Sequence, residues 1–125
     1  MKKQVLFGLA AGLALMAGVS AASAQSAADG EKVFRACKAC HSLEAGKKGV
    51  GPSLHGLIGR QSGTVEGFAY SPAMKNANLT WNDENLAKYL ADPKGFIAGN
   101  KMAFAGIKKE DDLKNLIAYL NEAAK

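Results

Sequence analysis

Cysteine and histidine are scarce in this sequence of 125 residues, which contains two of each. Three of these four lie within one short stretch, Cys37-Lys38-Ala39-Cys40-His41. A structural zinc site needs four ligands, and no second Cys-x-x-Cys pair or His-x-His cluster is present to complete one. A thioredoxin-like redox motif would be expected beside a βαβ pattern, which is also absent. Both absences argue against the two familiar uses of a Cys-x-x-Cys pair.

The same stretch is typical of covalent haem attachment. Two thiols three positions apart lie on one side of a helical turn, so Cys37 and Cys40 can both face one flat partner. The imidazole of His41 can reach the centre of that partner. A c-type haem requires two thioether bonds and a nitrogen ligand to iron, and ordinary structural cysteines rarely show this spacing before a histidine. The stretch predicts one haem c, bound through Cys37 and Cys40, with His41 as a ligand of the iron.

Residues 1–24 have the features of a secretory signal peptide. They comprise a basic start, an apolar run over residues 5–19 and the small-residue cleavage signal Ala22-Ser23-Ala24. The apolar run is short for a bilayer span of about 20 residues, which argues against a retained anchor. We expect cleavage before Gln25, leaving residues 25–125 as a single domain in a bacterial periplasm.

The charge of the chain does not indicate nucleic-acid binding. Lysine and arginine number 16 against 11 acidic residues; without Lys2 and Lys3 the basic count falls to 14, and the formal charge of residues 25–125 is +3. No basic stripe interleaved with aromatic residues accompanies this excess. A modest positive balance instead fits a local patch that attracts an acidic protein surface.

Strand signals are absent from residues 25–125, and the expected fold class is all-α. Three main helices are predicted to open near Ser26, Asn82 and Glu110, with short helical turns after Pro72 and Pro93. Glycine recurs throughout residues 42–67, and a loop of that length is uncommon unless it wraps around something, for which a haem would serve.

Gly30 lies inside the first predicted helix. Glycine costs a helix about 1 kcal/mol relative to alanine. Its presence indicates that another backbone or a large side chain packs closely there.

The second axial position of the iron has several candidate ligands, namely His55, Met74, Met102 and lysines. His55 follows His41 by only fourteen positions, so it is poorly placed to reach the opposite face of a haem, and a surface role is expected. Met74 follows a Ser-Pro turn and could simply fill a pocket. Met102 lies in a loop bracketed by glycines and is far enough from His41 to cross the opposite face. Spacing therefore favours Met102, with Met74 next.

Several motifs occur in the order seen in class I cytochromes c, and essentially all of residues 25–125 resembles that family. The resemblance is greatest to the mitochondrial type and its small soluble bacterial relatives. The motifs are Cys37-Lys38-Ala39-Cys40-His41, Gly51-Pro52-Ser53-Leu54-His55-Gly56, Leu79-Thr80-Trp81, Tyr89-Leu90, Lys101-Met102-Ala103-Phe104-Ala105-Gly106 and Leu116-Ile117-Ala118-Tyr119-Leu120.

The resemblance implies the cytochrome c fold around one haem and iron ligated by His41 and Met102. It implies that the Pro52 carbonyl accepts the His41 ring N–H. The hydroxyl of Tyr89 is implied to lie near the Met102 sulfur. One departure stands out, because Met74 occupies a position where the mitochondrial pattern usually has asparagine.

The resemblance also assigns roles to residues outside the ligand set. Arg60, Tyr70 and Trp81 match positions that surround a haem propionate. Gly30 and Phe34 match the contact between the first and last helices, with Tyr119 opposite.

An iron with six ligands has no open position, which favours electron transfer over catalysis. We therefore expect a monomeric electron carrier and not an enzyme. Its donor would be a quinol-oxidising cytochrome bc complex, and its acceptor a terminal oxidase or a photosynthetic reaction centre. The alternative is a peroxidase-like haem enzyme or a gas sensor in which Met102 is displaced, although the second cluster of catalytic residues that peroxidases need is not apparent.

Four lysines cluster in sequence around the Met102 loop: Lys94, Lys101, Lys108 and Lys109. A solvated charged face is the simple interpretation. The resemblance instead places these lysines around an exposed haem edge, where they would support weak, salt-dependent docking of redox partners.

Overall fold

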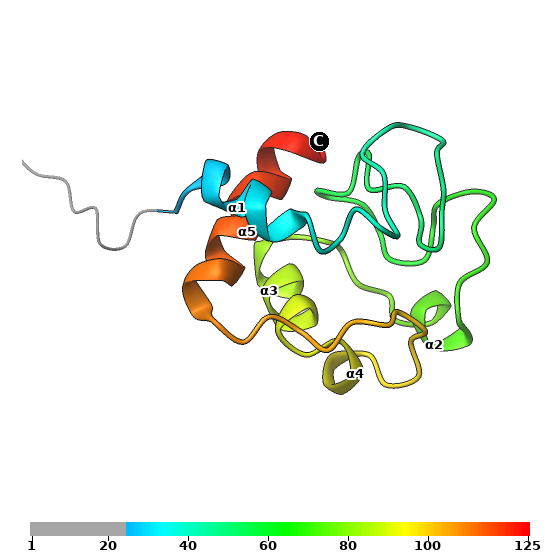
Figure 1. Ribbon diagram of the computed structural model, residues 1–125. Coiled ribbons are helices and arrows are strands. Elements are labelled where there is room, and N and C mark those ends of the chain that lie inside the picture. The colour runs from blue at the N-terminus through cyan, green and yellow to red at the C-terminus, as the bar shows by residue number, and fades with distance from the viewer. Residues whose placement is uncertain (1–24) are drawn as a thin grey trace, which may run out of the picture.

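The computed structural model describes residues 25–125 (Figure 1). The predicted signal peptide, residues 1–24, lies outside the described residues. The helices are α1 (Ala27–Phe34), α2 (Pro72–Lys75), α3 (Asp83–Ala91), α4 (Pro93–Phe96) and α5 (Glu110–Ala123). Strand-like pairing in this part of the chain is limited to an isolated bridge between Gln61 and Thr80. The predicted all-α class, with three main helices and two short helical turns, is confirmed.

The helices begin where local side chains satisfy the free backbone N–H groups of a first turn. At the start of each of the first four helices, the side-chain oxygen of the capping residue accepts a hydrogen bond from such an N–H group. The capping residues are Ser26, Ser71, Asn82 and Asp92. α5 has no side-chain cap, but three acidic residues in its first turn complement the positive end of its dipole. No helix in residues 25–125 is long and apolar enough to span a bilayer.

α1 and α5 lie side by side and make the most extensive contact between helices (Figure 1). A Cβ atom placed on Gly30 would collide with the backbone carbonyl of Asn115 and would lie 2.8 Å from the Cβ of Tyr119. The rings of Phe34 and Tyr119 pack with centroids 5.3 Å apart. The close approach expected at Gly30 is therefore present, and the backbone of α5 is what requires it.

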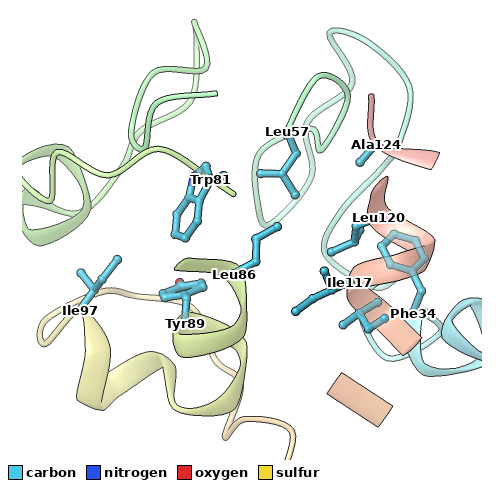
Figure 2. Packing of buried hydrophobic residues seen from close by; sticks show 10 residues of the cluster. Phe34, Leu57, Trp81, Leu86, Tyr89, Ile97, Ile117, Leu120 and Ala124 are labelled. Atoms are coloured by element: carbon cyan, nitrogen blue, oxygen red, sulfur yellow. The ribbon is translucent and has the colours of Figure 1, made fainter. Parts of the chain in front are cut away.

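The core extends from this helix pair to α3. Figure 2 shows Leu86 between two groups of side chains, with Phe34, Ile117 and Leu120 on one side and Trp81 and Tyr89 on the other. The rings of Trp81 and Tyr89 have centroids 5.1 Å apart. The chain between residues 42 and 67 contributes Leu57 to this core. It is also tied to the C-terminus, because the Lys125 carbonyl accepts a hydrogen bond from the Gly56 backbone N–H at 3.0 Å.

The two cysteines follow α1 and are not part of it. The α-helix ends at Phe34, and residues 35–40 form tighter turns. There the N–H of Cys37 donates to Phe34 and that of Cys40 donates to Cys37, each three residues back. With three residues per turn, side chains at i and i+3 point in the same direction. The tightening therefore brings the two thiols to one side more closely than an α-helix would.

Replacing Gly30 with alanine tests the contact between α1 and α5. Alanine improves helix propensity by about 1 kcal/mol, but its methyl group would collide with backbone atoms of α5. Because backbone cannot easily move aside, we expect an overpacking cost at the upper end of the usual range, about 3 kcal/mol. We expect the free energy of unfolding of the holoprotein to fall by about 2 kcal/mol, measured by guanidinium titration. The control Ala28→Gly lies on the exposed side of the same helix. Its free energy of unfolding should fall by about 1 kcal/mol, which is the difference in helix propensity alone. A Gly30→Ala protein as stable as the wild type would show that the helices do not approach this closely.

Candidate functional site

A cavity of about 230 Å³ lies between the helices and the long loops. Its walls are chiefly apolar and include side chains from the end of α1, from α3, from α5 and from the loops before and after them. All four residues predicted to bind the cofactor line it: Cys37, Cys40, His41 and Met102. The fold thus gathers at one place residues that are up to 65 positions apart in the sequence.

The two cysteines stand on the tight turns that follow α1. Both are free thiols and partly buried. Burial raises the pKa of the Cys37 thiol, and the nearby Cys40 raises it further by charge repulsion. The Cys37 thiol is therefore stabilised in its neutral form, which leaves no thiolate charge at that point of an apolar wall.

The His41 ring is held in one orientation. Its Nδ1 lies 2.8 Å from the carbonyl oxygen of Pro52. Since a carbonyl oxygen can only accept, Nδ1 carries the hydrogen and the lone pair of Nε2 remains free for a metal. Gly51 lies against the same ring, and a Cβ there would be 2.9 Å from Nδ1 and still closer to Cε1. Glycine at this position is therefore required for the ring to lie where it does.

Met102 is contacted through its sulfur and through both polar groups of its backbone. The Tyr89 hydroxyl lies 3.7 Å from the sulfur. Lys94 Nζ donates to the Met102 carbonyl at 2.8 Å, and the Met102 N–H donates to Asn100 Oδ1 at 2.8 Å. Burial raises the pKa of Tyr89 to about 12, so its hydroxyl stays protonated at neutral pH and remains a donor.

Of the other candidate ligands, Met74 lies in the cavity wall and His55 lies at the surface. Met74 is partly buried on α2 and lines the cavity. His55 is exposed and does not belong to the cavity wall, in agreement with the surface role expected for it. Both methionine sulfurs therefore remain chemically eligible, and only Met102 has a hydroxyl donor beside it.

The residues matched to a propionate environment also line the cavity. Arg60, Tyr70 and Trp81 all contribute to its wall. Arg60 Nη1 donates to the His55 carbonyl at 3.0 Å, and the Tyr70 hydroxyl accepts the N–H of Val65 at 3.0 Å. Partial burial lowers the pKa of Arg60, which is still a cation at neutral pH. This group of side chains is polar where the rest of the wall is apolar.

Asn100 has a role at this site that sequence reasoning missed. It is 5% exposed and is one of the few buried polar side chains in residues 25–125. Its carboxamide contacts the backbone of Met102 and of α4. Asparagine in a loop between glycines looks like ordinary turn chemistry, so nothing in the sequence distinguishes this residue.

The donor set of the cavity fits a haem. The apolar cavity is lined by two thiols, an imidazole and a thioether. One nitrogen of the imidazole has no hydrogen-bond partner among the described residues. An apolar wall suits a macrocycle, and the polar group around Arg60 suits its carboxylates. Within residues 25–125 no three side chains of Cys, His, Asp or Glu converge as they would in a site for a bare metal ion.

Comparison with known proteins agrees with this donor set. A family model described as cytochrome c matches residues 27–124. Cytochrome c2 of Blastochloris viridis is 50% identical over 121 residues, covering 96% of this chain and 93% of that protein. Cytochrome c2 iso-2 of Magnetospirillum fulvum is 57% identical over 93 residues, covering 74% and 97% respectively.

A solved structure shares the fold as well as the sequence. Cytochrome cH from Methylobacterium extorquens superposes with a TM-score of 0.74 at 46% identity, covering 78% of this chain and 98% of that one. Together with the family match, this similarity establishes the cofactor as one haem c joined through Cys37 and Cys40. The chain belongs to the class I cytochromes c, which are electron carriers and not enzymes.

Proposed function

We propose that this chain carries single electrons between membrane redox complexes of the periplasm, on a haem iron ligated by His41 and Met102. The observation that carries this proposal is the convergence of both thiols, the His41 ring and the Met102 sulfur on one apolar cavity. When bound, the haem supplies an iron that alternates between ferric and ferrous states.

The protein contributes orientation and an apolar environment. The Pro52 carbonyl aligns the His41 ring and increases the basicity of its free nitrogen. A thioether is a soft ligand that favours the ferrous state, as does a dry cavity, so both raise the reduction potential. A positive potential suits a carrier that accepts electrons from a quinol-oxidising complex.

Met102 is favoured over Met74 by its surroundings. The Tyr89 hydroxyl lies beside its sulfur, and its loop is anchored by Lys94. Met74 belongs instead to the single turn of α2, where its backbone N–H donates to the Ser71 cap. With His41 and Met102 both bound, no position on the iron remains for a substrate or a gas.

The ligand assignment can be tested in the matured holoprotein by absorption spectroscopy. A methionine–iron bond gives the oxidised protein a weak absorption band at the long-wavelength end of the visible spectrum. We expect Met102→Ala to abolish this band and to lower the reduction potential, because a soft ligand is lost. Met74→Ala is the matched control, as it removes the other methionine of the cavity wall and should retain the band.

Two outcomes would contradict the assignment. Loss of the band in Met74→Ala alone would make Met74 the ligand. Its absence from the wild type would indicate an open iron position and favour the alternative of a haem enzyme or gas sensor.

The proposed partners are a cytochrome bc complex as donor and a terminal oxidase or photosynthetic reaction centre as acceptor. The chain would act as a monomer, exported with residues 1–24 as its signal peptide. Lys101 and Lys108 are exposed on the loop that carries Met102, and Lys101 also lines the cavity. The ammonium of Lys101 lies 5.5 Å from the centre of the Phe68 ring, which positions its charge at the cavity edge.

Charge reversal tests whether this edge is the docking surface. The double variant Lys101→Glu/Lys108→Glu should be reduced by a purified cytochrome bc complex roughly tenfold more slowly at low salt, because attraction to an acidic surface is lost. The difference should shrink as ionic strength rises and shortens the Debye length. Stopped-flow absorbance at several salt concentrations measures both effects.

A matched control is available on the helices α1 and α5. Lys32 and Lys114 are exposed, do not line the cavity and pair with acidic residues of their own helices at 3.6 and 3.9 Å. Lys32→Glu/Lys114→Glu changes the net charge by the same amount. Equal slowing in both double variants would attribute the effect to net charge and refute docking at the Met102 edge.

A further inference from the structure

We propose that Asn100 is the positioning residue of Met102, whose carboxamide fixes the Met102 backbone to α4 and so keeps the sulfur in the cavity. This inference rests on the proposed role of Met102 as a ligand. It adds a residue that neither the motif nor the haem chemistry identifies.

The contacts of Asn100 connect three parts of the chain. Its Nδ2 donates to the carbonyl of Pro93 at 2.8 Å and to that of Ile97 at 2.9 Å. Its Oδ1 accepts the backbone N–H of Met102 at 2.8 Å. The side chain therefore joins the first turn of α4, the residue after α4 and the residue that carries the sulfur.

The orientation of the carboxamide is determined by its partners. Two carbonyl oxygens can only accept, so they face the NH2 group, and a backbone N–H can only donate, so it faces the oxygen. If Oδ1 and Nδ2 were exchanged, the oxygen would face two carbonyl oxygens and the NH2 group would face the Met102 N–H. The side chain thus has one satisfied orientation, and it is the one that restrains Met102.

Asn100 differs from Lys94, the other residue that contacts the Met102 backbone. Lys94 donates to the Met102 carbonyl from an exposed position, where water can replace its ammonium. Asn100 is buried, so removal of its carboxamide leaves the Met102 N–H without a partner among the described residues. The Pro93 and Ile97 carbonyls lose one donor each but still accept the backbone N–H groups of Ile97 and of residue 100. The loop would then be held mainly by groups that compete with solvent.

The Tyr89 hydroxyl is placed between Asn100 and the sulfur. It lies 3.5 Å from Asn100 Oδ1 and 3.7 Å from Met102 Sδ, and a phenol has one hydrogen to donate. When the Asn100 oxygen is removed, the Met102 sulfur is the acceptor that remains beside the Tyr89 hydroxyl. A hydrogen bond to a ligand sulfur withdraws electron density from it and disfavours the ferric state.

The test measures how readily Met102 leaves the iron. Imidazole added to the oxidised holoprotein can bind only where Met102 has been displaced, so its apparent affinity reports the fraction of open protein. We expect Asn100→Ala to bind imidazole roughly tenfold more tightly than the wild type. Its reduction potential should also rise, and this rise should disappear when Tyr89→Phe is added.

Two further variants separate positioning from loss of stability. Asn121 also makes two side-chain hydrogen bonds, to Asp83 at 2.8 Å and to the Ile117 carbonyl at 2.9 Å, but it does not line the cavity. Asn121→Ala should lower stability without changing imidazole affinity. Asn100→Thr retains a hydroxyl that can accept the Met102 N–H, so its affinity should lie between those of the wild type and Asn100→Ala.

The outcomes distinguish this inference from the ligand assignment. Unchanged imidazole affinity in Asn100→Ala, with the methionine band lost in Met102→Ala, would refute the role of Asn100 alone. A band that survives Met102→Ala would refute the assignment of Met102, and the role of Asn100 with it. If Asn100→Ala yields no holoprotein, Asn100→Thr decides, since an affinity equal to that of the wild type would overturn the proposal.

Discussion

The crossing of α1 and α5 at Gly30 is the contact on which the rest of the site depends. α1 is only eight residues long, and a helix of that length is not stable by itself in water. It persists because its glycine face lies directly on the α5 backbone and Phe34 packs against Tyr119. The cysteines and His41 project from the turns that follow α1 immediately. Their positions are therefore determined by a helix that α5 holds in place.

The two sides of the cavity are built on different physical principles. On the His41 side the backbone is packed tightly, with a ring held by one carbonyl and a glycine that leaves it space. On the Met102 side an irregular loop is held by polar side chains, one buried and one exposed. Hydrogen bonds each contribute about 1 kcal/mol net, so a loop that depends on a few of them opens more easily than a packed helix pair. This asymmetry makes the methionine side the weaker one.

Composition also differs between the cavity and its edge. The wall is chiefly apolar, which keeps the dielectric constant low around the haem site and strengthens the influence of each neighbouring dipole. The edge carries Arg60 and Lys101, whose charges remain in contact with solvent. A carrier needs this combination, because the redox centre must be protected while one side remains close enough to a partner for electron transfer.

Local sequence patterns determined the helices and the haem attachment residues, because periodicity, capping and a spacing of three act between neighbouring residues. The same patterns predict His41 as a ligand, since it directly follows Cys40. The close contact at Gly30 was also predictable, since glycine weakens a helix and is tolerated inside one chiefly where a neighbouring backbone needs the space. Only the tertiary structure decided where α1 ends, which methionines line the cavity and which partners the buried carboxamide of Asn100 has. These features depend on which segments meet in space, and Asn100 in particular acquires its partners from α4 and Met102 only after the chain has folded around the cavity.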